Sequence, residues 1–187
     1  MVKKIYIVRH CEAQGQPSEA QLTNKGFEQA RLLSDFFSDK KIDRIISSSF
    51  IRAIQSIEPL SVHKNVTVEV DQRLTERILS EENLADWLEK LKRTYDNLDA
   101  KYKGGESSRE AMNRISCVVN EIFNSHFEST IIVTHGNIMS LLLKKYNHHF
   151  GFDEWKSLSN PDVYLLTSKD RAISVKRVWQ EGEINEI

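Results

Sequence analysis

Short apolar runs recur along the chain with the lengths and residue types of β-strands. The run Lys3 to Val8 is apolar on both faces from Ile5 onward, which is typical of a central strand in a covered parallel sheet. The run Thr130 to Thr134 (TIIVT) is the most strand-like in the sequence. Four further runs predict strands, over residues 43–47, 66–70, 163–167 and 172–178.

Between these runs, apolar positions follow the spacing of amphipathic helices. Thr23 is a suitable N-cap for a first helix, whose apolar stripe reaches Phe37. Ile51, Ile54 and Ile57 predict a second helix. Pro59 should end or bend that helix, because its ring removes a donor and crowds the preceding turn.

Three more helices are predicted in the second half of the chain. The third is expected to start at Ser80 and to bury an apolar stripe that includes Trp87 and extends to Leu98. Ser107, with a glutamate three residues later, has the spacing of a capping box for the fourth. The last covers residues 138–145 and follows directly after the TIIVT strand.

The alternation of strands and helices predicts the fold class. Helices that connect parallel strands must cover both faces of the sheet, so we expect a three-layer α/β sandwich with a mostly parallel central sheet. No repeat or long linker divides the chain, so residues 1–187 are interpreted as one domain. In such sheets the functional site lies at the carboxyl ends of the strands.

The overall charge excludes some classes of partner. The 26 Lys and Arg residues nearly balance the 27 Asp and Glu residues, which leaves a formal net charge of -1. No overall field therefore favours nucleic acid or an anionic membrane. The first apolar stretch, Ile5 to Val8, is far shorter than the about 20 residues of a membrane span. We expect a cytoplasmic protein, and the sequence leaves its oligomeric state open.

Neither cysteines nor histidines form a recognisable metal-binding or disulfide pattern. Cys11 and Cys117 make no CxxC pair and no disulfide framework, so reduced thiols are expected. His148 and His149 lack Cys or carboxylate neighbours at ligand spacing and are interpreted as a surface turn. The sequence therefore predicts no metal site and no cofactor.

Polar residues with catalytic potential follow four of the predicted strands. The first strand ends in Arg9-His10, and the second runs into a helix start that carries Arg52. Glu76 follows the third strand, and His135 ends the TIIVT strand. These side chains can share one crevice, because the carboxyl ends of parallel strands meet at one edge of the sheet. Guanidinium groups match phosphoryl oxygens bidentately and neutral imidazole is a competent nucleophile, so the set suits phosphoryl chemistry.

The same residues stand in motifs that resemble the histidine phosphatase superfamily, which includes the cofactor-dependent phosphoglycerate mutases. Arg9-His10 is similar to the family's opening Arg-His pair, and LTNKGFEQA resembles its Leu-Thr-x-x-Gly-x-x-Gln-Ala segment. The later motifs are SSSFIRAIQS, which selects Arg52, RLTE, which selects Glu76, the Gly-Glu-Ser of residues 105–107, and VTHGN, which selects His135. The resemblance spans nearly the whole chain and implies a phosphoglycerate mutase-like fold.

The chemistry of these residue types suggests a role for each. His10 is expected to be the nucleophile that forms a phosphohistidine, and Glu76 the general acid and base of both half-reactions. Arg9 and Arg52 are expected to clamp the phosphoryl oxygens, and His135 to add a further donor as an imidazolium. Asn137 is also assigned to substrate binding, although Asn137, like the glutamate at 106, could equally fix a turn.

One residue departs from the family pattern. The family usually has Gly after the Arg-His pair, whereas this chain has Cys11, whose side chain costs backbone freedom at a tight strand exit. An alternative is that Cys11 is itself a thiolate nucleophile activated by Arg9 and His10. A cysteine phosphatase normally cradles phosphate in a loop that ends in Arg, and CEAQGQP contains no such Arg. The histidine mechanism is therefore preferred.

The sequence favours hydrolysis over mutase-type phosphoryl transfer. The mutases of the family usually continue past the acidic residue with Tyr-Gly, whereas this chain reads ERILSEEN. A non-catalytic phosphate or phosphopeptide-binding module is the third possibility, but Glu76 would oppose a bound dianion unless it is needed as an acid. We therefore expect a metal-independent phosphomonoester hydrolase for a small phosphorylated substrate. Its specificity should come from residues 12–22 and 77–105. There a set of basic side chains could contact an acidic substrate or could simply face water: Arg77, Lys92, Arg93, Lys101 and Lys103.

Overall fold

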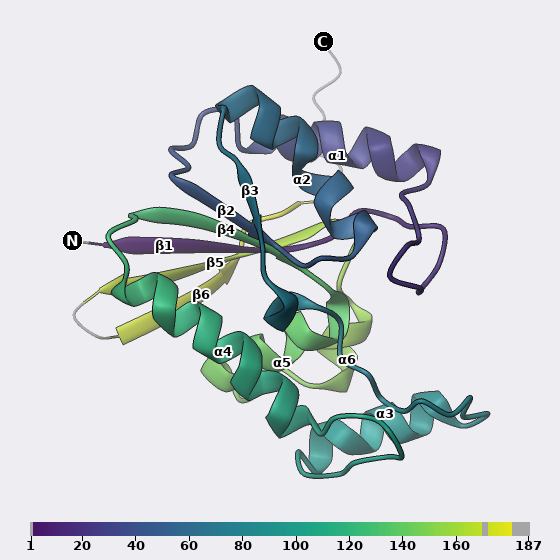
Figure 1. Cartoon of the computed structure of the whole chain (residues 1–187). Helices are drawn as coiled ribbons and strands as arrows, with labels where there is room; N and C mark the ends of the chain where they lie inside the picture. The colour runs from purple at the N-terminus through teal and green to yellow at the C-terminus, as the bar shows by residue number, and fades with distance from the viewer. Residues whose placement is uncertain (1, 170–171, 181–187) are drawn as a thin grey trace.

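Across residues 2–169 and 172–180, the part of the chain that the computed structural model describes, six strands form one sheet (Figure 1). The strands span Lys3–Arg9 (β1), Arg44–Ser47 (β2), Val68–Val70 (β3), Ser129–Thr134 (β4), Asp162–Lys169 (β5) and Ala172–Arg177 (β6). Their order in the sheet is β3-β2-β4-β1-β5-β6. Strands β3, β2, β4 and β1 run parallel, and β5 and β6 add an antiparallel edge. The prediction of a mostly parallel sheet is confirmed.

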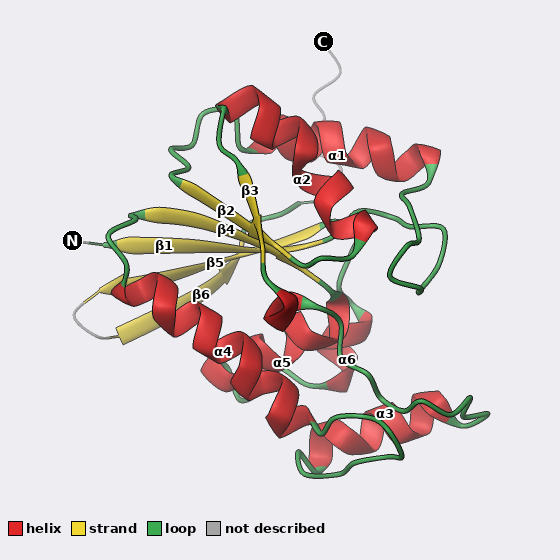
Figure 2. Ribbon diagram, in the orientation of Figure 1, coloured by secondary structure: helices red, strands yellow, loops and turns green. Residues whose placement is uncertain are grey.

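Helices lie on both faces of this sheet (Figure 2). They span Asn24–Phe36 (α1), Ile51–Lys64 (α2), Trp87–Asp96 (α3), Ser108–Asn124 (α4), Gly136–Tyr146 (α5) and Phe152–Lys156 (α6), with a short 3-10 helix at Gln72–Leu74. Helices α1 and α2 cover one face, and α4 and α5 cover the other (Figure 1). The expected three-layer sandwich is therefore confirmed. No helix in the described ranges is long and apolar enough to cross a membrane.

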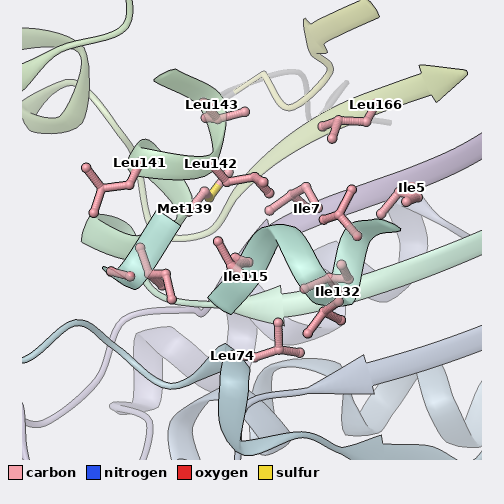
Figure 3. Close-up of a cluster of buried hydrophobic side chains, with 14 of the residues drawn as sticks. Ile5, Ile7, Leu74, Ile115, Ile132, Met139, Leu141, Leu142, Leu143 and Leu166 are labelled. Atoms are coloured by element: carbon pink, nitrogen blue, oxygen red, sulfur yellow. The ribbon is translucent and has the colours of Figure 1, made fainter. Parts of the chain in front are cut away.

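Strand β1 illustrates why both faces need a cover. Successive side chains of a strand point to opposite faces. Ile5 and Ile7 accordingly join the buried cluster under α4 and α5, which Figure 3 shows, whereas Tyr6 and Val8 join the cluster under α1 and α2. All four side chains are buried, and this two-sided burial explains the continuous apolar run in the sequence.

The expectation that Pro59 would end or bend the second helix is wrong about the end, because α2 continues to Lys64. Leu60, directly after the proline, is fully buried in the cluster under α1 and α2, so packing stabilises the turn that lacks a backbone donor. The helix ends instead at Asn65, which adopts the left-handed conformation with φ of 53° and donates its N–H to the carbonyls of the last turn.

The third helix is shorter than predicted. It begins at Trp87 rather than at Ser80, and Leu98 lies beyond its end at Asp96. Ser80 is used differently, because its hydroxyl donates to the carbonyl of Lys103 and accepts from the N–H of Glu82, which closes a local turn. Trp87 also remains 51% exposed, and of the predicted apolar stripe only Leu91 and Tyr95 are buried.

Candidate active site

The carboxyl ends of β1, β2 and β4 bring the predicted residues to one edge of the sheet. Arg9 pairs with Thr134 in the parallel ladder, and the N–H of His10 donates to the carbonyl of Thr134 at 3.1 Å. His135 follows directly and stands at the N-cap of α5. The rings of His10 and His135 lie with their centroids 5.1 Å apart.

His10 is oriented by hydrogen bonds at both ring nitrogens. Its Nδ1 lies 2.6 Å from the carbonyl oxygen of Cys11, so Nδ1 carries the proton and donates. Its Nε2 then has a lone pair, which accepts from Nε of Arg52 at 3.3 Å. Burial, together with the charges of Arg52 and Arg9, lowers the pKa of His10 to about 3. The imidazole is therefore neutral at physiological pH, with Nε2 available as a nucleophile.

Arg52 is buried despite its charge, at 1% exposure. It comes from the first turn of α2, and its Nη1 donates to the carbonyl of Pro17 at 2.7 Å. The guanidinium also lies over the ring of Phe50, 4.9 Å from its centroid. These contacts hold the fork against Nε2 of His10, where a phosphoryl group transferred to that nitrogen would meet it.

Arg9 is held from a distant part of the chain. Its Nη1 donates to the carbonyls of Leu158 and Ser159, at 2.9 and 3.4 Å, and its buried Nε has no hydrogen-bond partner among the described residues. A Cβ at Gly136 would lie 2.9 Å from that Nε, so the glycine leaves room for the Arg9 guanidinium beside the start of α5. This buried donor lacks an acceptor in the described part of the chain, and an anionic oxygen placed beside it would satisfy it.

A buried carboxylate supports the loop that holds Arg9. Asp162 is fully buried and accepts from the N–H of Ser159 and, bidentately, from Arg177 at 2.8 and 2.9 Å. In the same loop, the Asn160 side chain donates to the carbonyl of His10 at 2.8 Å. The sequence analysis missed this support, because nothing in the local pattern of residues 158–162 indicates that they contact β1.

Glu76 lies against the start of α5. Its Oε2 accepts from the N–H of Asn137 at 3.0 Å, and its Oε1 accepts from the N–H groups of Ile138 and Arg77 at 2.9 and 2.8 Å. The positive end of the helix therefore faces the carboxylate. Burial lowers the pKa values of Arg9 and Arg52, and the negative charge of Glu76 partly offsets this effect by raising them. Glu76 thus lies close enough to both arginines to influence their pKa values.

The loop that carries Glu76 is anchored by a second group of polar residues. Arg114 of α4 donates to the carbonyls of Arg73 and Thr75, at 2.7 and 2.9 Å, and forms an ion pair with Glu106 at 2.5 Å. Arg77 is buried and donates to the carbonyl of Glu106. Glu106 therefore fixes the loop, and the interpretation of Arg77 as a possible substrate contact is wrong.

His135 is fully buried, with its ring against those of His10 and Phe50. Its Nε2 lies 2.7 Å from Oγ of Ser48, and its Nδ1 has no hydrogen-bond partner in the described part of the chain. Burial, with the nearby His10 and Arg52, lowers its pKa well below the usual range. This shift favours the neutral imidazole over the expected imidazolium.

Asn137 contributes to the site through its backbone. Its N–H donates to Glu76, whereas its side-chain Nδ2 donates to the hydroxyl of Tyr95 at 3.0 Å. That hydroxyl in turn contacts Oγ of Ser140. The Asn137 side chain is thus engaged in a buried network that joins α3 to α5. Its amide nitrogen is therefore already engaged, and direct contact of Asn137 with substrate stays a prediction.

Cys11 fits the strand exit where the family usually has glycine. The residue lies outside the positive-φ region, its side chain is fully buried, and its N–H donates to Oγ of Ser56 at 2.8 Å. Burial raises the pKa of the thiol to about 12, which argues against a thiolate nucleophile. The described residues also contain no group of three His, Cys, Asp or Glu side chains that could hold a metal ion.

Solved structures of similar fold include several phosphatases. A mycobacterial glucosyl-3-phosphoglycerate phosphatase aligns with a TM-score of 0.77 and 20% identity, over 95% of this chain and 97% of that one. A phosphoglycerate mutase from Bacillus anthracis aligns with a TM-score of 0.74 and 16% identity, over 95% of this chain and 92% of that one. At these identities the similarity shows the fold, which is phosphoglycerate mutase-like as expected.

Sequence comparisons point to the same family. The chain is 29% identical over 157 residues to a Hydrogenobacter thermophilus protein provisionally named phosphoserine phosphatase 2, covering 76% of this chain and 77% of that protein. It is 26% identical over 145 residues to phosphoserine phosphatase 1 of the same bacterium, covering 70% and 69%. The model of the histidine phosphatase superfamily, branch 1, matches residues 5–180. With its Arg-His strand end, second histidine and buried arginine in one crevice, the chain belongs to branch 1 of the histidine phosphatase superfamily.

Proposed function

We propose that the protein is a phosphomonoester hydrolase that transfers the phosphoryl group first to Nε2 of His10 and then to water. The observation that carries the proposal is the state of His10. Its Nδ1 donates to the Cys11 carbonyl, and its neutral Nε2 faces the guanidinium of Arg52. Phosphoryl transfer requires an unprotonated nucleophilic nitrogen next to a cation that can bind the oxygens of the transferred group, and Arg52 would exchange its hydrogen bond to Nε2 for one to those oxygens.

The first half-reaction forms the Nε2–P bond as the bond from phosphorus to the ester oxygen breaks. Arg9 and Arg52 balance the charge on the phosphoryl oxygens, and Glu76, protonated at this stage, gives its proton to the departing alkoxide. The Nδ1–H of His10 stays on the Cys11 carbonyl, which stabilises the positive imidazole of the phosphohistidine.

The second half-reaction reverses these roles with water as the nucleophile. Glu76, now ionised, takes a proton from the attacking water, the P–N bond breaks, and inorganic phosphate leaves. An ionised carboxylate has about four acceptor sites. In the described part of the chain, three backbone N–H groups occupy three of those sites on Glu76. The fourth site can accept the proton from water.

Glu76 also supports an enzyme rather than a phosphate-binding module. In a site that only bound a dianion, Arg9 and Arg52 would strengthen binding. The Glu76 carboxylate, which lies close enough to influence both arginines, would weaken it by repulsion. A hydrolase is further supported by the relatives, two of which carry phosphatase names, and by the absence of the Tyr-Gly pair that follows the acidic residue in the mutases. Phosphoserine therefore belongs in the first panel of small phosphomonoesters to be screened.

The nucleophile can be identified by trapping the phosphoenzyme. During turnover of a 32P-labelled phosphomonoester, quenched protein should carry label that is stable in base and lost in acid, as expected for a phosphohistidine. The label should be absent in His10→Ala. It should be present in Cys11→Ser, which replaces only the thiol sulfur with oxygen. Label that maps to Cys11, or that persists in His10→Ala, would refute the mechanism.

Metal independence is the second testable part of the proposal. The positive charge assigned to the site comes from Arg9 and Arg52, so activity should survive exhaustive treatment with EDTA followed by gel filtration. The check is kcat/KM before and after treatment, with added Mg²⁺, Mn²⁺ and Zn²⁺ in parallel. Loss of activity that one of these ions restores would show that a metal supplies charge we assign to the arginines.

A further inference from the structure

Among the described residues, Ser48 provides the one hydrogen-bond contact to the His135 ring. Its Oγ lies 2.7 Å from Nε2 of His135, and both side chains are fully buried. The ring is also packed edge-on against Phe50, with centroids 4.8 Å apart, which restrains its rotation. Because the imidazole is neutral, it carries one proton, and that proton is on either Nδ1 or Nε2.

The hydrogen bonds of Ser48 decide between the two tautomers. Its Oγ already accepts the N–H of Phe50 at 3.2 Å, and its single proton needs an acceptor in this buried position. If Ser48 donates to Nε2 of His135, the hydroxyl is fully satisfied. If His135 donates instead, Oγ accepts twice and the hydroxyl proton has no acceptor among the described contacts, which costs free energy in a buried site.

The same choice matters at the other nitrogen. Nδ1 of His135 is buried and has no hydrogen-bond partner in the described part of the chain. With the proton on Nδ1, this atom is a donor for a phosphoryl oxygen. With the proton on Nε2, a lone pair at Nδ1 would repel that oxygen.

We propose that Ser48 is a positioning residue, which donates to Nε2 of His135 and so holds this histidine as the Nδ1–H tautomer that donates to the transferring phosphoryl group. The inference rests on the proposed function for its catalytic consequence. The tautomer itself can be measured in the resting protein without turnover.

The tautomer is read from 15N chemical shifts of histidine-labelled protein, with the His135 signals assigned by their loss in His135→Gln. We expect a protonated Nδ1 and an unprotonated Nε2 in the wild type. In Ser48→Ala the proton should shift toward Nε2, whereas Ser48→Thr, which keeps the hydroxyl, should retain the wild-type pattern. A wild-type His135 protonated at Nε2 would overturn the proposal whether or not any variant folds.

Kinetics separate positioning from a merely structural role. Ser48→Ala should lower kcat roughly 10- to 100-fold, below the full loss of about 10²- to 10³-fold expected for removing an oxyanion donor. Ser48→Thr should recover most of that rate. Ser47→Ala is the matched control, because this buried hydroxyl donates to the Ser48 carbonyl and no contact in the structure joins it to His135. It should keep near wild-type activity.

A double-mutant cycle completes the test. In the His135→Gln background, Ser48→Ala should have little further effect, because the residue acts through the imidazole. Full additivity of the two losses would overturn the proposal. Failure of the proposed function gives a different signature, since His10→Ala would then retain turnover while the 15N pattern of His135 stays unchanged.

Discussion

Replacing Glu76 with glutamine changes one oxygen of a carboxylate that contacts three backbone donors. The amide oxygen can still accept from Arg77 and Ile138, as Oε1 does now. The amide nitrogen would then face the N–H of Asn137, which now donates to Oε2 at 3.0 Å. The variant keeps the size of the side chain, removes its ability to move a proton, and replaces one hydrogen bond with two opposed donors.

The effect of the substitution on the free energy of unfolding and its effect on the activation barrier can be calculated separately. Losing a hydrogen bond to a charged group should reduce the free energy of unfolding by about 1.5 to 3 kcal/mol. Losing general-acid catalysis should slow an alkyl phosphate about 10²- to 10⁴-fold, which corresponds to roughly 3 to 5 kcal/mol in the barrier. An aryl phosphate with an acidic phenol needs little proton transfer to its leaving group, so its first step should be nearly unaffected.

The assay compares the two substrate types in rapid-mixing experiments. With the aryl phosphate, Glu76→Gln should release a burst of phenol close to one equivalent of enzyme, followed by slow turnover, because water then lacks its base. Phosphoenzyme should accumulate on His10 during the slow phase. With phosphoserine or another alkyl phosphate, the burst itself should be slow. Urea unfolding of the same preparations measures the structural cost.

The matched control is Glu82→Gln, in the same segment but on the surface. Its carboxylate pairs with Lys103 at 2.8 Å and is 52% exposed, so the substitution should leave both substrates unaffected. Equal slowing of aryl and alkyl phosphates in Glu76→Gln, without a burst, would refute the assignment of Glu76 as acid and base.

Two further predictions concern the charged groups around His10. Arg52→Lys keeps the charge but loses the planar guanidinium that reaches His10 and Pro17. We expect kcat/KM to fall roughly 10- to 150-fold, the equivalent of about 1.5 to 3 kcal/mol. A kcat/KM close to that of the wild type would contradict bidentate binding of the phosphoryl group by Arg52. The pKa of His10, lowered to about 3 by burial and by Arg52 and Arg9, predicts stability that is present above pH 6.5 and lost as pH falls from 6.5 toward 3, because the unfolded chain takes the proton first. Between pH 7 and pH 5 this loss is about 2 kcal/mol, so His10→Gln should show a smaller decrease in unfolding free energy over that range than the wild type, and an equal decrease would refute the neutral buried imidazole.

The sequence determined the elements and the edge of the sheet at which the site lies. Apolar periodicity is a local property, so it located each strand and the caps at Thr23 and Ser107, whose side chains accept from N–H groups three residues later. The motifs at strand ends were also local, and parallel strands bring their carboxyl ends together whatever the rest of the fold does. For this reason the sequence alone predicts that Arg9, His10 and His135 lie together at one edge of the sheet.

Local patterns failed where tertiary contacts compete with them. Ser80 has the sequence of a helix start, but its hydroxyl contacts Lys103 across the loop and the helix begins at Trp87. Pro59 has the sequence of a helix end, but burial of Leu60 carries α2 past it. In both cases a contact with a residue distant in sequence outweighs a preference that amounts to a few kcal/mol at most.

The protonation and support of the site depended wholly on the tertiary structure. His135 is an ordinary histidine in the sequence, and only its burial beside His10 and Arg52 lowers its pKa and favours the neutral ring, with Ser48 at its Nε2. Arg9 depends on the carbonyl of Leu158, 149 residues away along the chain. Such contacts carry no local signature, because the chain positions that make them are brought together only when the sheet forms. Sequence therefore specified which chemical groups are present, and the fold decided which of their protons and lone pairs are free to act.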